Sequence, residues 1–145
     1  MRASISPKTR EQVRKRALHV CEYCLVHEDL LMFSAQVDHI ISLKHGGGND
    51  LENLAYCYIR CNRNKGTDLG SILHDKTKII RFYNPRSDRW SDHFEIKNAK
   101  IVPKTAIGQV TDNIFRFNTK ERVVERKLLG ELGLFPHPDA VEILK

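Results

Sequence analysis

The four cysteines constrain this chain most, because they occur as two close pairs. Cys21 and Cys24 are separated by two residues, and Cys57 and Cys61 by three. Two pairs at such spacings can place four thiolates around one Zn²⁺ in tetrahedral geometry. In a reducing compartment, such pairs favour metal binding over disulfides. The sequence therefore predicts a closed, structural zinc site; four reduced cysteines in an ordinary core are the alternative.

The charges are segregated along the chain. Residues 2–16 carry six basic residues and one acidic one, residues 17–59 carry one basic and six acidic, and residues 60–104 carry eleven basic and five acidic. The net charge is +6. Basic flanks around an acidic segment suit a cation that faces a polyanion such as nucleic acid. A solvated, slightly basic surface is the alternative.

Length and composition favour one soluble domain. The chain has 145 residues, of which 41% are hydrophobic, and no linker requires a second domain. We expect a basic N-terminal segment over residues 1–20, a core over 21–70 and a C-terminal extension over 71–145. The N-terminus lacks the apolar run of a signal peptide, and no stretch is apolar enough to span a membrane. The expected location is the cytoplasm.

The first half of the chain predicts a succession of short elements. Ser6 followed by Pro7 is typical of a helix start, and Gly66 of a helix end. Three consecutive glycines in the stretch HGGGND permit positive φ angles and close backbone approach. The predicted elements are a basic helix over 7–19, strands over 36–41 and 54–57, a glycine loop over 45–50 between them, and a helix over 60–66.

The second half predicts a strand, a hairpin and two helices. The hairpin turns at Asn98, and a capping box formed by Asn118 and Glu121 is expected to start the last helix, which stops at Gly133. The predicted elements are a strand over 79–83, hairpin strands over 94–96 and 101–102, a helix with Ile107, Val110, Ile114 and Phe117 on one face, and a helix with Val124, Leu128 and Leu132 on one face. These apolar faces are expected to be core; a partner-docking role for the last stripe is the alternative.

Four polar residues between the cysteine pairs supply what phosphodiester hydrolysis requires. His39 titrates near neutrality and can act as a general base toward water. Asp38 and Asn62 offer hard oxygen ligands that suit Mg²⁺ or Mn²⁺. Asn53 can position His39 or the loop backbone. Taken singly, each residue has an ordinary reading as a turn, a cap or a surface pair; taken together, they indicate a catalytic site.

Two further basic residues follow these four in the sequence. Arg63 and Lys65 lie on the helix predicted after the second cysteine pair, and we expect them to contact phosphate groups.

The same residues resemble the zinc-containing form of the HNH endonuclease motif. The stretches that carry the resemblance are Cys21-x2-Cys24, Asp38-His39-Ile40, Gly46-Gly47, Glu52-Asn53-Leu54 and Cys61-Asn62-x-x-Lys65-Gly66. The resemblance implies an α+β fold with a ββα-metal finger and zinc knuckles, flanked here by the N-terminal helix and a C-terminal strand and helix extension. It implies that His39 is the general base, Asp38 and Asn62 are metal ligands, and Asn53 orients the base.

Two other features bear on this resemblance. The family usually has its third cysteine where Tyr58 stands, so Cys57 would reach the zinc only through a local adjustment of the strand. The stretch Asn84-Pro85-Arg86 with Trp90 and His93-Phe94 resembles the C-terminal extension of small bacterial HNH proteins of unassigned role.

The resulting prediction is a metal-dependent endonuclease that hydrolyses duplex DNA by a one-metal mechanism, with Mg²⁺ or Mn²⁺ as catalytic ion and Zn²⁺ as structural ion. A homodimer would suit double-strand cleavage. The first alternative is a non-catalytic, zinc-stabilised DNA-binding module. The second is a protein-interaction domain that docks a partner through its C-terminal helices.

Overall fold

The computed structural model describes residues 4–30 and 35–141. Their elements are α1 (Pro7–Arg16), β1 (Ala35–His39), β2 (Leu54–Tyr58), α2 (Ile59–Lys65), β3 (Gly70–Ser71), β4 (Ile80–Arg81), α3 (Trp90–His93), β5 (Phe94–Lys97), β6 (Lys100–Pro103), α4 (Ala106–Phe115) and α5 (Lys120–Glu131). Single 3₁₀ turns precede β1, occur twice between β1 and β2, and follow α5. Among the described residues, the strands form three separate antiparallel pairs: β1–β2, β3–β4 and β5–β6.

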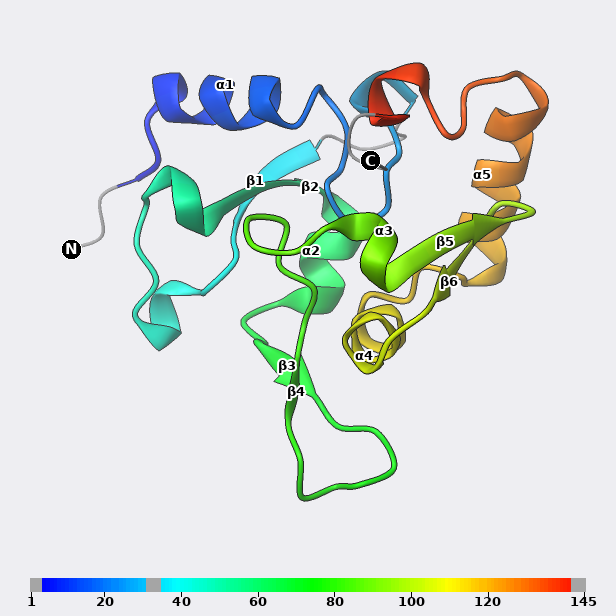
Figure 1. The fold of residues 1–145 in the computed structure, drawn as a ribbon. Helices are drawn as coiled ribbons and strands as arrows, with labels where there is room; N and C mark the ends of the chain where they lie inside the picture. The colour runs from blue at the N-terminus through cyan, green and yellow to red at the C-terminus, as the bar shows by residue number, and fades with distance from the viewer. Residues whose placement is uncertain (1–3, 31–34, 142–145) are drawn as a thin grey trace.

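Helix α1 begins as predicted and ends earlier than predicted. The Ser6 hydroxyl accepts a hydrogen bond from the Thr9 N–H, and Pro7 occupies the first turn, where its missing N–H costs nothing. The helix stops at Arg16 because Leu18 and His19 adopt positive φ angles of 56° and 64°. The apolar face of α1 packs on β2 (Figure 1) and forms a small core of its own.

The predicted order of strand, glycine loop, strand and helix is confirmed. In the β1–β2 pair, Asp38 lies opposite Ala55 and His39 opposite Leu54. Every residue of β2 is buried, and α2 follows it directly. Gly66 ends α2 with φ +55°, a conformation that side chains disfavour.

The loop between β1 and β2 depends on two of its glycines. Gly46 has φ +87°, in the left-handed region. A Cβ atom on Gly47 would lie 1.7 Å from the Ile41 carbonyl oxygen, so this position has no room for a side chain. The HGGGND stretch is therefore held tightly against the residues that follow β1.

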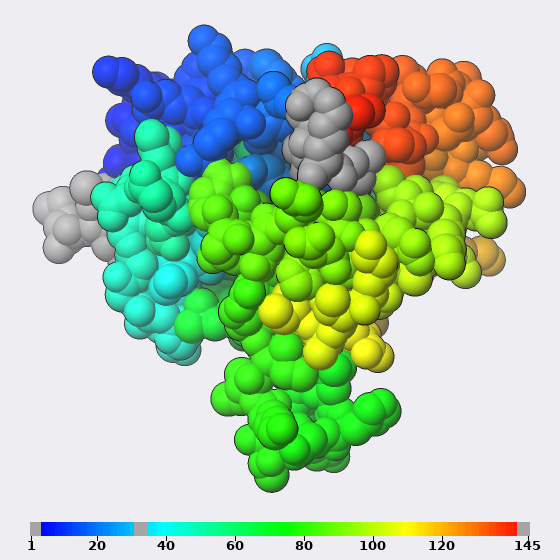
Figure 2. All heavy atoms as spheres, in the orientation of Figure 1, coloured from blue at the N-terminus to red at the C-terminus, as the bar shows by residue number. Residues whose placement is uncertain are grey.

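The extension covers the side of α2 that faces away from β1, and one hairpin projects from the body. The β5–β6 hairpin turns at Asn98 and Ala99, as predicted at Asn98. The strand predicted over 79–83 is reduced to β4, which pairs with β3 at the base of an arm that projects from the body in Figures 1 and 2. The extension supplies most of the aromatic side chains of the main core: Phe82, Tyr83, Trp90, Phe94, Phe115 and Phe117.

Helix α5 differs from the prediction in its N-terminal cap and in the face that it buries. Thr119, not Asn118, caps α5; the Asn118 side chain instead bonds both backbone groups of Ile101. The expectation of a core stripe on α5 is wrong, because Val124, Leu128 and Leu132 are 48%, 56% and 72% exposed. The buried side chains of α5 are those of two arginines, Arg122 and Arg126.

These arginines can be buried because their guanidinium groups find acceptors. Arg122 donates to the carbonyls of Phe115 and Arg116, and Arg126 donates to the carbonyl of Ala99 and to Asn118. Hydrogen-bonded guanidinium groups can therefore form the buried face of α5, although periodicity predicted that its aliphatic face would be the buried one. Among the described residues, no helix is long and apolar enough to cross a membrane.

Candidate active site and cysteine cluster

The end of β1 places Asp38 against α2. Its carboxylate is buried and lies 3.2 Å from the Lys65 ammonium, which also donates to the His39 carbonyl at 2.8 Å. Burial raises the pKa of Asp38, although the charges of Lys65 and His39 oppose this shift. The Oδ2 atom of Asp38 is buried and faces the Lys65 ammonium at 3.2 Å. Carboxylate oxygens are the hard ligands that a divalent cation prefers, so Asp38 offers a cation ligand at this position.

Lys65 therefore has a different position from the one predicted for it. Its side chain is buried, and its ammonium contacts Asp38 and the β1 backbone, so it faces inward rather than toward a phosphate group. A buried lysine is stable when a carboxylate neutralises it.

His39 is held by a residue that sequence reasoning missed. Its Nε2 atom lies 2.7 Å from Oδ1 of Asn49, in the glycine loop. Because a carbonyl oxygen only accepts, Nε2 carries the proton and Nδ1 is the basic nitrogen of the neutral ring. The asparagine in GGGND was the available signal, but the way the loop folds back to His39 cannot be read from its spacing.

Asn53 fixes the glycine loop to the end of β1. Its Oδ1 accepts from the Ile41 N–H at 2.8 Å, and its Nδ2 donates to the carbonyls of Ile41 and Gly48 at 2.9 Å each. Of the two roles that the sequence allowed, the structure places Asn53 on the loop backbone. It acts on His39 through the loop that carries Asn49.

Asn62 borders the same face of β1 as Asp38. Its Nδ2 donates to Oε1 of Gln36 at 2.7 Å. Gln36 and Asp38 are two residues apart on β1 and so share one face, while Asn62 and Lys65 are three apart on α2 and share another. The bond to Gln36 uses Nδ2, whereas the atom that suits a cation is Oδ1.

The cysteines gather where the turn that contains Cys21 and Cys24, the first knuckle, meets α2. Cys21, Cys24 and Cys61 are all buried, and their sulfur atoms lie within 4.8 Å of one another. Cys57 is outside this group, although its thiol interacts with those of Cys21 and Cys61, and its Sγ lies 3.4 Å from the Tyr58 carbonyl. The structure therefore brings three of the four predicted zinc ligands together and places the fourth beside them.

Charge in this cluster is balanced by an arginine of the extension. Nη2 of Arg122 lies 3.0 Å from Sγ of Cys61. Burial raises the pKa of Cys21, and it raises that of Cys24 to about 12. For Cys61, burial is outweighed by hydrogen bonds from the other cysteines and by the Arg122 charge, so its pKa is lowered. The cluster is thus suited to thiolate, and Zn²⁺ would supply the charge that deprotonates the remaining sulfurs.

Two residues of the extension anchor the first knuckle. Arg86 pairs with the buried Glu22 carboxylate, and Trp90 donates through its indole N–H to the Tyr23 carbonyl at 3.0 Å. Both residues belong to the stretch that begins at Asn84. This stretch therefore holds the segment between Cys21 and Cys24 in place.

A second group of metal-binding residue types lies near the C-terminal segment. His27, His137 and Asp139 have ligand atoms within 4.8 Å of one another. Nδ1 of each histidine already accepts a backbone N–H, from Asp29 and Asp139 respectively. The two rings also stack, with centroids 4.2 Å apart, so this group serves as a packing contact between distant segments.

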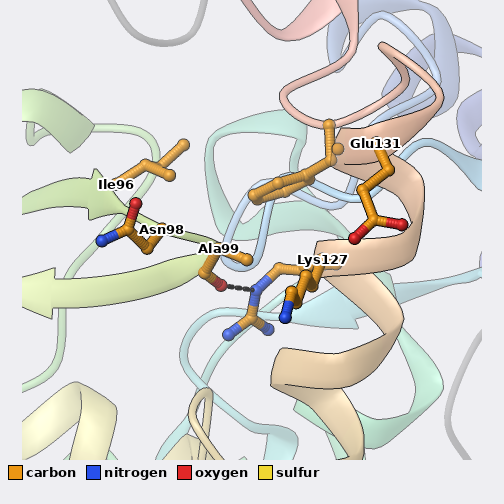
Figure 3. A pocket seen from close by; sticks show the side chains of 8 residues that line it. Ile96, Asn98, Ala99, Lys127 and Glu131 are labelled. Atoms are coloured by element: carbon orange, nitrogen blue, oxygen red, sulfur yellow. Dashed lines mark hydrogen bonds between the residues drawn. The ribbon is translucent and has the colours of Figure 1, made fainter.

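A separate pocket of 310 Å³ lies between the β5–β6 hairpin and α5 (Figure 3). Ile96, Asn98 and Ala99 face Lys127 and Glu131 across it, and Arg126 donates to the Ala99 carbonyl. It contains none of the residues proposed for catalysis. The polar centre around Asp38 and His39 is therefore the candidate active site.

The fold and site define a small α+β protein with a polar centre beside a cysteine cluster. Residues 21–68, called the HNH segment from here on, match the family model described as HNH endonuclease, and this match supports membership of the HNH family. The match contains all four cysteines and Asp38, His39, Asn53 and Asn62. A comparison with curated proteins finds no match.

Proposed function

We propose that this protein is a metal-dependent endonuclease that hydrolyses phosphodiester bonds of DNA by the HNH one-metal mechanism. The observation that carries the proposal is the juxtaposition at the end of β1. Asp38 presents a buried carboxylate, Asn62 borders the same strand face, and Asn49 holds the His39 ring. A non-catalytic binding module does not require this combination.

The residues fit a hard divalent cation. Asp38 and Asn62 would hold it, and Mg²⁺ or Mn²⁺ is the proposed ion. Such an ion stabilises negative charge on the phosphate and on the leaving oxygen. The Lys65 ammonium lies 3.2 Å from Asp38 and opposes the rise in the pKa of Asp38 that burial causes.

His39 is the proposed general base. Asn49 accepts a hydrogen bond from the Nε2–H of His39, which leaves Nδ1 to take a proton from the attacking water. Asn53 is a positioning residue, because its three hydrogen bonds hold the loop that carries Asn49. Cys21, Cys24 and Cys61, with Cys57 as the proposed fourth ligand, would hold a structural Zn²⁺ at the base of α2.

A plasmid-nicking assay tests the proposal. Zinc-loaded protein is incubated with supercoiled plasmid and Mg²⁺, Mn²⁺ or EDTA, alongside His39→Ala and the matched control His45→Ala, whose side chain is exposed in the loop. We expect His39→Ala to lose about 10²–10⁴-fold in rate while it still binds DNA, and His45→Ala to retain activity. Equal cleavage by wild type and His39→Ala would contradict the assigned role.

The alternative, a zinc-stabilised DNA-binding module, predicts binding without cleavage in any metal. The appearance of nicked rather than linear plasmid separates single-strand from double-strand cleavage. Because two strands of opposite polarity must be cut for a linear product, light scattering of the protein on the same DNA tests the proposed homodimer.

A further inference from the structure

A second basic site lies between α2 and the turn that joins α4 to α5. This arginine pocket has a volume of 260 Å³. Its lining residues are Arg60, Arg63, Asn64, Arg116, Thr119, Glu121 and Arg122. Half of the pocket thus comes from the HNH segment and half from the extension.

The pocket has a rigid floor. Arg122 is 4% exposed, and its Nη1 atom donates to the Phe115 carbonyl at 2.9 Å. Asn64 of α2 donates to the same carbonyl at 2.7 Å. The Asn64 bond joins α2 to the end of α4, and the Arg122 bond joins α5 to the same residue. The backbone segments that carry the pocket's arginines are therefore fixed relative to one another before any ligand arrives, which lowers the entropic cost of binding.

Arg116 adopts an unusual backbone conformation at the pocket rim. It ends α4 with φ +56° and ψ +53°, in the left-handed region that glycine usually occupies at such a position. A non-glycine residue there carries a modest strain. Its side chain is exposed and lines the pocket.

The charge of the pocket is strongly positive. Four guanidinium groups line it against one carboxylate, that of Glu121. No ion pair within residues 4–30 and 35–141 joins Glu121 to these arginines. The first turn of the twelve-residue helix α5 follows Thr119, and its dipole adds positive potential. Planar guanidinium groups in such an array match the geometry of phosphate oxygens.

We propose that the arginine pocket binds a backbone phosphate of the nucleic acid, at a position separate from the scissile bond. The proposal rests on the proposed function for the choice of substrate. Arg60, Arg63 and Asn64 lie on one side of α2, whereas Asn62 and Lys65 on the other side contact β1. The two sites therefore flank α2.

The width of α2 sets the distance between the two phosphates. A helix with its side chains is about 10–12 Å across, and one strand of a duplex rises about 3.4 Å per nucleotide. The pocket would therefore hold a phosphate a few nucleotides from the one at Asp38. The extension thereby contributes a second phosphate-binding site for the substrate.

The test is duplex binding by a charge-removal variant. Arg60→Gln, Arg63→Gln and Arg116→Gln are combined, and Arg122 is kept because it contacts Cys61. The matched control combines Lys97→Gln, Lys100→Gln and Lys104→Gln, three exposed basic residues of the β5–β6 region. Affinity for a labelled duplex of about 20 base pairs is measured by fluorescence anisotropy, without Mg²⁺ or Mn²⁺, over a range of NaCl concentrations.

We expect the arginine variant to bind at least about tenfold more weakly at ~0.1 M salt. The slope of log affinity against log salt should become shallower by about one, because one phosphate contact contributes about 0.9. Unchanged circular dichroism and zinc content exclude misfolding. A loss no larger than that of the control would overturn the proposal, as would calorimetric binding of inorganic phosphate at the pocket with unaltered duplex affinity.

The outcomes also separate this proposal from the nuclease assignment. Binding that depends on the pocket without cleavage in any metal would remove the nuclease and leave the pocket. Cleavage with unchanged duplex binding by the arginine variant would do the reverse.

Discussion

The HNH segment and the C-terminal extension contribute different kinds of residue to one structure. Residues 21–68 supply the cysteines and the polar centre on two five-residue strands and a seven-residue helix. The extension supplies most of the aromatic side chains of the main core, including Trp90, Phe94 and Phe117. The short segment that carries the chemistry shares this core with the extension, so the cysteine cluster and the extension both stabilise it.

Three contacts join the two regions at the knuckles. Arg86 pairs with Glu22, Trp90 donates to the Tyr23 carbonyl, and Arg122 donates to Cys61. Each one comes from the extension and ends at or beside a cysteine pair. Substitutions in each region can show which of the two depends on the other.

Loss of a thiol from the three-sulfur group should affect stability most. Structural Zn²⁺ in small domains contributes about 10–16 kcal/mol of apparent binding free energy, so Cys24→Ser is expected to unfold the HNH segment. Zinc content by mass spectrometry and near-ultraviolet circular dichroism measure the effect. Cys57→Ser is the comparison, since Cys57 lies outside the group; we expect it to weaken zinc binding but to retain the fold. A fully folded, zinc-free Cys24→Ser protein would contradict the zinc assignment.

Truncation of an aromatic side chain in the extension should come next. Phe117 is fully buried, and Phe117→Ala is expected to cost about 3–5 kcal/mol of unfolding free energy, measured by denaturant titration. Leu128→Ala on the exposed face of α5 should cost less than about 1 kcal/mol. Comparable losses in both variants would show that the α5 stripe is covered in solution.

Replacement of Arg122 tests whether the extension stabilises the cysteine cluster. Arg122→Met removes a hydrogen bond to a charged group and should cost about 2–3 kcal/mol. It should also speed the release of zinc to a chelator, because the charge beside Cys61 is lost. Arg126→Met is the control: this residue is equally buried but bonds Ala99 and Asn118. Equal zinc release from the two variants would remove the proposed role of Arg122.

The smallest effect concerns pH and lies within the extension. Arg81 donates to both carboxylate oxygens of Asp88, at 2.6 and 2.9 Å, and this lowers the pKa of Asp88. The unfolded chain then binds more protons than the folded one near pH 4, so this stabilisation is present above about pH 4 and lost as pH falls through the lowered pKa. Asp88→Asn should reduce stability by about 1 kcal/mol or less at neutral pH and flatten the acid limb of the stability profile.

The sequence predicted the HNH segment more completely than the extension. Its glycine loop and helix follow from local signals such as the three consecutive glycines and Gly66, and the cysteine spacing indicated that the two cysteine pairs converge. Asn49 and the inward position of Lys65 were missed, because both depend on contacts between residues far apart in the chain.

The face of α5 was misjudged for a related reason. Periodicity identifies an apolar stripe, but it cannot show that Arg122 finds carbonyls and a sulfur in the interior. The burial of arginine rather than leucine is decided by acceptors that other elements provide. The hairpin at Asn98 was predictable because its turn chemistry is local.

The anchors on the two knuckles have a consequence for protein engineering. A fragment of residues 21–68 grafted onto another scaffold would lose the Trp90 indole that donates to the Tyr23 carbonyl. It would also lose the Arg122 guanidinium that donates to Cys61. Its thiolates would then carry uncompensated charge, and its helix would expose the side on which α4 rests. The HNH segment of this protein is therefore not an independent unit, and a grafted version must include the C-terminal extension.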